Sequence, residues 1–155
     1  MGILVILEQK DNTIHKMSLE ALAGAQDMAD KLDTDISILV LGGDVTALTA
    51  QSQNFDVKEV IVAEHELLSE YSCDGFSESV KQVIERESPE YVVMAHTYMV
   101  RDFLPRVSAK LQIPFVSDVI KFRVEGDRPI FTKQVFNAKL AADITSSSSQ
   151  TTLVS

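Results

Sequence analysis

Two polar turns in this sequence carry residue types that could bind a ligand or move a proton. The first contains His96, Thr97, Arg101 and Asp102 and follows a buried apolar run. A histidine, an arginine and a carboxylate can act together in acid–base chemistry, and open α/β sheets bind ligands at turns that follow their strands. No serine or cysteine nucleophile motif accompanies this turn, so a ligand or partner contact and a purely structural turn stand beside catalysis as alternatives.

The second turn is Gly42-Gly43-Asp44, between an apolar run and a predicted helix. Free amides at a helix N-terminus can hold a phosphate. However, the chain has no G-x-G-x-x-G or G-x-x-x-x-G-K-[ST] motif, and residues 97–104 contain no glycine, which argues against ATP. The carboxylate of Asp44 would also repel a phosphate. A plain turn is the alternative to a cofactor site, whose candidate contacts are Gly42, Gly43, His96, Thr97 and Arg101.

Metal and disulfide chemistry find little support in the sequence. The three histidines, His15, His65 and His96, fall on separate predicted loops, and none has a second ligand at metal spacing. The single cysteine, Cys73, cannot form an internal disulfide and fits a reducing compartment. We therefore expect no metal site, and we interpret Cys73 as a small residue at a helix start.

Strands and helices alternate around these turns. A strand buried on both faces is predicted from the continuous apolar run at residues 3–7. Further buried strands are predicted at 36–41 and 91–95, and a third strand in chain order at 60–63. Helices are predicted at 19–32 with Ser18 as N-cap, at 45–53, from Ser72 or Asp74 to Glu87, and at 103–111. This alternation implies a parallel sheet with right-handed crossovers.

The helix predicted at 103–111 follows directly on the His96 turn. Asp102 is the predicted N-cap, because its carboxylate can accept from the free amides of the first turn. Pro105 would then take the third helical position, where its missing N–H costs nothing. The helix is expected to end before Pro114.

After Pro114 the apolar residues alternate with polar ones. Strands are predicted at 116–124, 129–136 and 140–144, with a hairpin turn at Glu125-Gly126-Asp127. Residues 151–154 are expected to pair with these strands across a loop at Ser146–Ser149. The predicted fold class is therefore α/β: a three-layer α/β/α domain of the Rossmann-like, adenine-nucleotide-hydrolase-like type over residues 1–155. Its mainly parallel core lies in 1–115 and an antiparallel β appendage in 116–155.

Composition excludes several classes of function. The chain has 155 residues and is 45% hydrophobic, which suits one globular domain with a sizeable core. Its net charge of −9 argues against a nucleic acid partner, and no apolar run reaches the ~18 residues of a membrane span. The N-terminus is predicted to be a strand and not a signal peptide. We expect a bacterial cytoplasmic or mitochondrial-matrix-like location, without secretion.

The run FLPRVSAKLQIPFVSDVI at 103–120 resembles a segment of electron transfer flavoprotein α subunits, written LLPRVAA-L and followed by SD-I. The resemblance covers the whole chain, through ILVILE, SLEALAGA, EVIVAEH, PEYVVMAHT and a final strand pair similar to the family's Y-A-GNAL-x-TV. There are two departures. Residues 98–102 replace the family's small-Gly-Lys turn, and Phe136 replaces the glycine before Asn137. The chain also stops where the family's FAD-binding domain would begin.

The resemblance implies an N-terminal scaffold and heterodimerisation domain with no catalytic site, and so no enzyme activity, of its own. It implies FAD in the second domain, AMP in the β subunit, and electron flow from flavin dehydrogenases to an acceptor through the complex. An isolated domain is expected to expose apolar surface and to self-associate. The partner interface it implies contains Arg101, Asp102, Arg106, Asp118 and Asn137.

Two other functions compete with this one. A free-standing adenine-nucleotide-binding α/β domain rests on Gly42-Gly43 and on the crevice beyond the strand at 91–95. A small hydrolase using His96 ranks last, because the sequence suggests no substrate.

Overall fold

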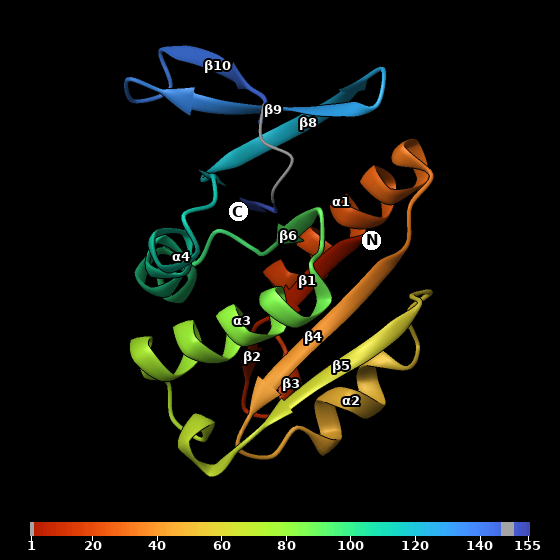
Figure 1. The fold of residues 1–155 in the computed structure, drawn as a ribbon, viewed down its shortest axis with the longest axis vertical. Coiled ribbons are helices and arrows are strands. Elements are labelled where there is room, and N and C mark those ends of the chain that lie inside the picture. The colour runs from red at the N-terminus through yellow and green to blue at the C-terminus, as the bar shows by residue number, and fades with distance from the viewer. Residues whose placement is uncertain (1, 147–150) are drawn as a thin grey trace.

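A computed structural model describes residues 2–146 and 151–155, and its centre is a six-stranded sheet (Figure 1). In chain order its strands are β1 (Ile3–Leu7), β4 (Ile36–Gly42), β5 (Glu59–Glu64), β6 (Tyr91–Val93), β7 (Phe115–Val116) and β11 (Thr152–Val154). Their spatial order is β5-β4-β1-β6-β11-β7, and every pairing is parallel. The order reverses between β1 and β6, so the crevice that α/β sheets use for ligands lies there.

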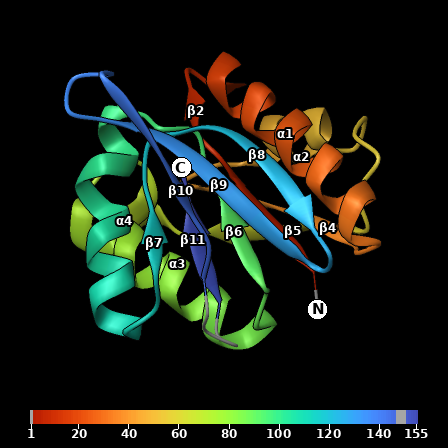
Figure 2. The ribbon, with the colours of Figure 1, turned by 90° about the horizontal axis from the view of Figure 1, so that it is seen from above.

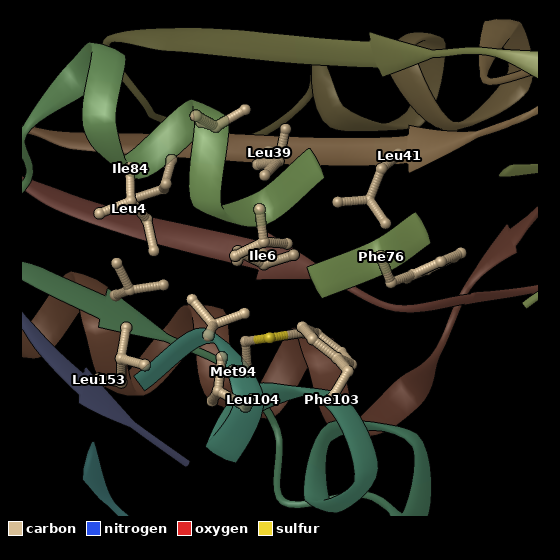
Figure 3. Close-up of a cluster of buried hydrophobic side chains, with 14 of the residues drawn as sticks. Leu4, Ile6, Leu39, Leu41, Phe76, Ile84, Met94, Phe103, Leu104 and Leu153 are labelled. Carbon is tan, nitrogen blue, oxygen red and sulfur yellow. The ribbon is translucent and has the colours of Figure 1, made fainter. Parts of the chain in front are cut away.

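Helices cover both faces of this sheet, because successive strand residues point to opposite sides. Leu4 and Ile6 pack with Phe103 under α3 (Cys73–Glu87) and α4 (Tyr98–Leu111) (Figure 3). Ile3 and Val5 pack on the other face, under α1 (Lys16–Leu32) and α2 (Thr46–Ser52). The predicted three-layer α/β/α fold is thus confirmed. A small hairpin, β2 (Gln9–Lys10) with β3 (Thr13–Ile14), follows β1, and a short 3-10 helix, η1 (Glu66–Leu68), follows β5.

A separate antiparallel sheet lies over the end of α1 (Figures 1 and 2). It consists of β8 (Val119–Glu125), β9 (Arg128–Val135) and β10 (Leu140–Ile144), with β9 in the middle. Phe131 is buried in the same cluster as the α1 side chains, and Phe122 packs against that cluster. The predicted antiparallel appendage and its turn around Gly126 are therefore confirmed.

The expected pairing of residues 151–154 with the antiparallel strands is wrong. These residues form β11, which lies in the parallel sheet between β6 and β7. Leu153 is fully buried, and its N–H donates to the Pro114 carbonyl at 2.9 Å. A short apolar segment with neighbours on both sides gains more burial in the central sheet than at the edge of the outer one. Most of the predicted serine loop, at 147–149, lies outside the described residues.

The expected start of the fourth helix is also wrong. Helix α4 begins at Tyr98, and its N-cap is Thr97, whose hydroxyl accepts from the Val100 N–H at 3.2 Å. Pro105 therefore lies inside the helix and cannot donate to the carbonyl of Arg101. Both residues are exposed, so water can satisfy that carbonyl.

Two further helix starts test the predicted caps. Ser72 caps α3, as one of the two alternatives predicted, by accepting from the Gly75 N–H at 3.2 Å. Helix α1 begins earlier than expected, after His15. Ser18 is buried inside α1, and its hydroxyl accepts from the Glu8 N–H at 2.9 Å.

Candidate functional site

The His96 turn lies where the strand order reverses, between the carboxyl ends of β1 and β6. Glu8 follows β1, and its Oε2 accepts from the hydroxyl of Thr97 at 2.5 Å. The same hydroxyl caps α4. This contact bridges the two strand ends and places a carboxylate between them, which disfavours a phosphate at this position.

His96 is engaged by Ser155, a residue that no sequence motif suggested. The ring Nδ1 lies 2.8 Å from the Ser155 Oγ, and Ser155 is buried. The Ser155 N–H also donates to the Val116 carbonyl at 3.0 Å. A serine beside a histidine can act as a nucleophile and base, but a third group must orient the ring. No described acid bonds to the second ring nitrogen, so the contact supports a tie between the ends of β6 and β11 better than it supports catalysis.

Close packing explains Gly43 of the second turn. Gly42 ends β4, and its carbonyl accepts from the His65 N–H at 3.1 Å. A Cβ atom built on Gly43 would lie 2.0 Å from the Ser69 Oγ and 2.8 Å from the Ser69 Cα. Only glycine therefore lets the loop after η1 approach this turn.

Two carboxylates already occupy the amides at the start of α2. The Asp44 Oδ1 accepts from the Thr46 N–H at 3.0 Å, and the Glu64 Oε2 accepts from the Val45 N–H at 3.2 Å. The hydrogen bond from the Thr46 backbone holds the pKa of Asp44 below its usual value. A phosphate would have to displace both acids, so the turn does not present a free anion site.

Asp102 fixes α4 to the segment before α3 instead of capping α4. Its Oδ2 accepts from the Tyr71 hydroxyl at 2.5 Å, and its carbonyl lies 3.5 Å from the Cys73 Sγ. The Tyr71 hydrogen bond, and then Cys73, lower the pKa of Asp102. Partial burial, and then the bond to Asp102, raise the pKa of Tyr71. The cluster therefore holds an ionised carboxylate against a neutral phenol.

The two arginines of α4 lie on its exposed side. Arg106 pairs with Asp74 of α3 at 3.1 Å. The Arg101 guanidinium lies over the ring of Tyr98, 5.7 Å from its centre, and that ring is 88% exposed. An exposed aromatic ring beside a cation is typical of protein contact surfaces.

The remaining interface candidates lie on separate loops. Asp118 is exposed between β7 and β8, and Asn137 is exposed in the β9–β10 turn. Figures 1 and 2 both place this turn on the α4 side of the molecule. The structure thus groups Arg101, Asp102 and Arg106 on one helix and places Asp118 and Asn137 on two separate loops.

An open groove of about 550 Å³ runs between α1 and β8. Met17 and Ala21 line it from α1, and Ile120 and Lys121 line it from β8. His96 and Ser155 also line it. Ile120 is 53% exposed, so the groove offers apolar surface to a partner.

The described ranges contain neither a metal-binding cluster nor a membrane-spanning helix. Across 2–146 and 151–155, His, Cys, Asp and Glu side chains form no group of three that could hold a metal ion. No helix within those ranges has the length and apolar character needed to cross a membrane.

Comparisons with known proteins point to one family. The model of the electron transfer flavoprotein domain matches residues 3–155. Electron transfer flavoprotein subunit alpha of Bacillus subtilis is 28% identical over 137 residues, which cover 88% of this chain and 42% of that protein. The same subunit of Clostridium acetobutylicum is 28% identical over 145 residues, or 92% of this chain and 43% of the relative. Protein FixB of Clostridium saccharobutylicum is 29% identical over 145 residues, with the same coverage. The chain thus spans less than half the length of these relatives.

Proposed function

Because the chain belongs to the electron transfer flavoprotein domain family, we propose that it is the N-terminal scaffold and heterodimerisation domain of an alpha-type subunit. The observation that carries this proposal is the similarity of about nine-tenths of the chain to relatives named subunit alpha, within a domain match over residues 3–155. In the proposal, FAD binds to a second domain of the full subunit and AMP binds to the β-type partner. Electrons then pass from flavin dehydrogenases to an acceptor through the complex, and this domain performs no reaction itself.

The occupied crevice supports a scaffold over the alternative, a free-standing adenine-nucleotide-binding domain. Glu8 and Thr97 bridge the ends of β1 and β6. Carboxylates hold the first amides of α2. Both places where a nucleotide phosphate was expected thus carry negative charge, and the alternative requires both to rearrange.

The proposed partner surface combines α4 with the β9–β10 turn, which lies on the same side of the molecule. Arg101 and Arg106 supply positive charge on a chain whose net charge is −9. Phe136, beside Asn137, is 74% exposed and supplies apolar area. Interfaces that combine exposed aromatic rings with arginines are common, because both side chains bury large areas when they bind.

Co-purification of this chain with a β-type subunit of electron transfer flavoprotein tests the proposal. We expect a stable one-to-one complex, and we expect Arg106→Glu to weaken it about tenfold or more. Lys58→Glu is the matched control, because Lys58 is also an exposed cation paired with an aspartate, Asp35, at 3.0 Å. Exposed pairs of this kind contribute little to folding, so both variants should remain folded. Failure of the unmodified chain to bind the β-type subunit would refute the proposal.

A further inference from the structure

The antiparallel sheet has two edge strands, because β9 lies between β8 and β10. An edge strand presents unpaired backbone groups, and proteins commonly protect such an edge with charged side chains. Lys121, Arg123 and Glu125 are exposed on β8 and provide that protection. The sequence of β10 is LAADI, so its only charge is on Asp143. Of the two edges, β10 is the less protected.

Asp143 is held in place by its own sheet. Its Oδ2 accepts from the Arg123 Nη1 at 2.8 Å, and its Oδ1 accepts from the Thr132 hydroxyl at 2.7 Å. These contacts, Thr132 first, lower its pKa, so the carboxylate stays ionised at neutral pH. A strand that pairs with β10 would therefore meet one fixed negative charge in an otherwise apolar sequence.

Apolar side chains cluster where β10 begins. Leu140 is 60% exposed, and Phe136, in the turn before it, is 74% exposed. Ala141 and Ala142 are small and allow another backbone to come close. Within the part of the chain that the structure describes, β10 pairs only with β9. An apolar edge of this kind is suited to the addition of a strand.

We propose that β10 pairs antiparallel with β10 of a second copy of this chain, about a two-fold axis at Ala142. In this register Leu140 lies opposite Ile144 of the second copy. Ala141 lies opposite Asp143 of the second copy. Apolar residues then face apolar residues and no like charges meet, which makes the strand self-complementary.

The same operation disfavours β8 as the interface. A two-fold axis at its central residue, Phe122, places Lys121 opposite Arg123 of the second copy. Like charges directly opposite each other destabilise a strand pair. Because β10 contributes only five residues, we expect a small interface and a reversible dimer that depends on protein concentration.

Charge substitutions at Ala141 test the pairing by sedimentation equilibrium over a range of protein concentrations. Ala141→Asp places two carboxylates opposite each other at two symmetric positions, so it should raise the dimer Kd about fivefold or more. Ala141→Lys places a cation opposite Asp143 of the second copy and should lower the Kd. Gln134→Asp is the matched control. It adds the same charge to the same face, opposite Ala141 within the subunit, but on the central strand.

Three results would each overturn this inference. The first is a chain that sediments as a monomer at every concentration. The second is a change of Kd in the same direction for Ala141→Asp and Ala141→Lys. The third is an effect of Gln134→Asp as large as that of Ala141→Asp, which would place self-association elsewhere. Circular dichroism of each variant establishes that it is folded, and none of these results depends on the β-type partner.

Discussion

Phe136 adopts a backbone conformation that suits glycine, and it stands where the resembled family has one. Its φ is 53°, and Asn137 and Ala138 also have positive φ values, of 53° and 63°. The left-handed region costs a residue with a Cβ about 1–2 kcal/mol. The backbone of this turn is therefore strained. In the sequence, the only indication of this strain is that Phe136 replaces the family's glycine.

Replacing Phe136 with glycine should stabilise the domain by about 1 kcal/mol, because it removes the Cβ responsible for the strain. Thermal or urea unfolding measures the change. Phe136→Ala is the control, since it removes the ring but keeps the Cβ and should give no such gain. Equal stabilisation by the two variants would mean that the exposed ring, and not the φ angle, is the source.

Tyr71 makes stability depend on pH through Asp102. The hydrogen bond lowers the pKa of Asp102 in the folded state, so its stabilising effect is present above the unfolded pKa of about 3.9. That effect is lost as the pH falls through the lower, folded-state pKa. Tyr71→Phe should therefore lower the melting temperature at pH 7.

The difference between Tyr71→Phe and the unmodified chain should disappear at strongly acidic pH, where Asp102 is protonated in both. Melting curves from neutral to acidic pH follow this change. Ser79→Ala, a partly exposed residue elsewhere in α3, controls for general acid sensitivity. A difference that stays constant over the whole range would separate the Tyr71 contribution from the charge of Asp102.

At the scale of the element, α4 depends on one hydroxyl. Thr97 caps the helix through Val100 and also donates to Glu8. Thr97→Ala should cost about 1–2 kcal/mol of unfolding free energy, because it removes the cap and leaves Glu8 without this donor. Thr97→Ser keeps the hydroxyl and should retain most of the stability. Chemical denaturation measures the unfolding free energy of both variants. If both lost the same amount, the hydroxyl of Thr97 would not be the source of the stabilisation.

The βα units could be predicted from sequence because their signals are local. Ile3–Leu7 is apolar without interruption, and Ser72 precedes a helical pattern, so strand and cap follow from neighbouring residues. The start of α4 was predicted five residues too late, because Asp102 and Pro105 together resemble a helix start. The helix instead begins at Tyr98, because the Thr97 hydroxyl caps it there and because Pro105 is exposed and can be accommodated inside it.

Long-range placement could not be predicted in this way. The local sequence of Thr152–Val154 is compatible with a strand in either the antiparallel or the parallel sheet. Its place in the parallel sheet depends on its pairing with both β6 and β7, which are distant in the chain. The contact between His96 and Ser155 follows from that placement, since it joins residues 59 apart in the chain. Likewise, the approach of Ser69 explains Gly43 only once the loops are in place.

At the scale of the whole molecule, two sheets share one core. Phe131 from the antiparallel sheet is buried with α1 side chains, and β11 returns the chain to the parallel sheet between β6 and β7. The antiparallel sheet is thus attached at both ends to the parallel core. Such a unit can hold α4 and the β9–β10 turn in a fixed relation, as the proposed scaffold role requires.

Titration calorimetry of this chain against a purified β-type subunit tests the central claim most directly. The scaffold account predicts saturable heat at one-to-one stoichiometry. It also predicts that AMP and ATP, titrated into the chain alone in the same instrument, give no binding heat, because carboxylates occupy both expected phosphate positions. Binding of AMP or ATP by the chain, with no heat from the β-type subunit, would contradict the account and favour a free-standing nucleotide-binding domain.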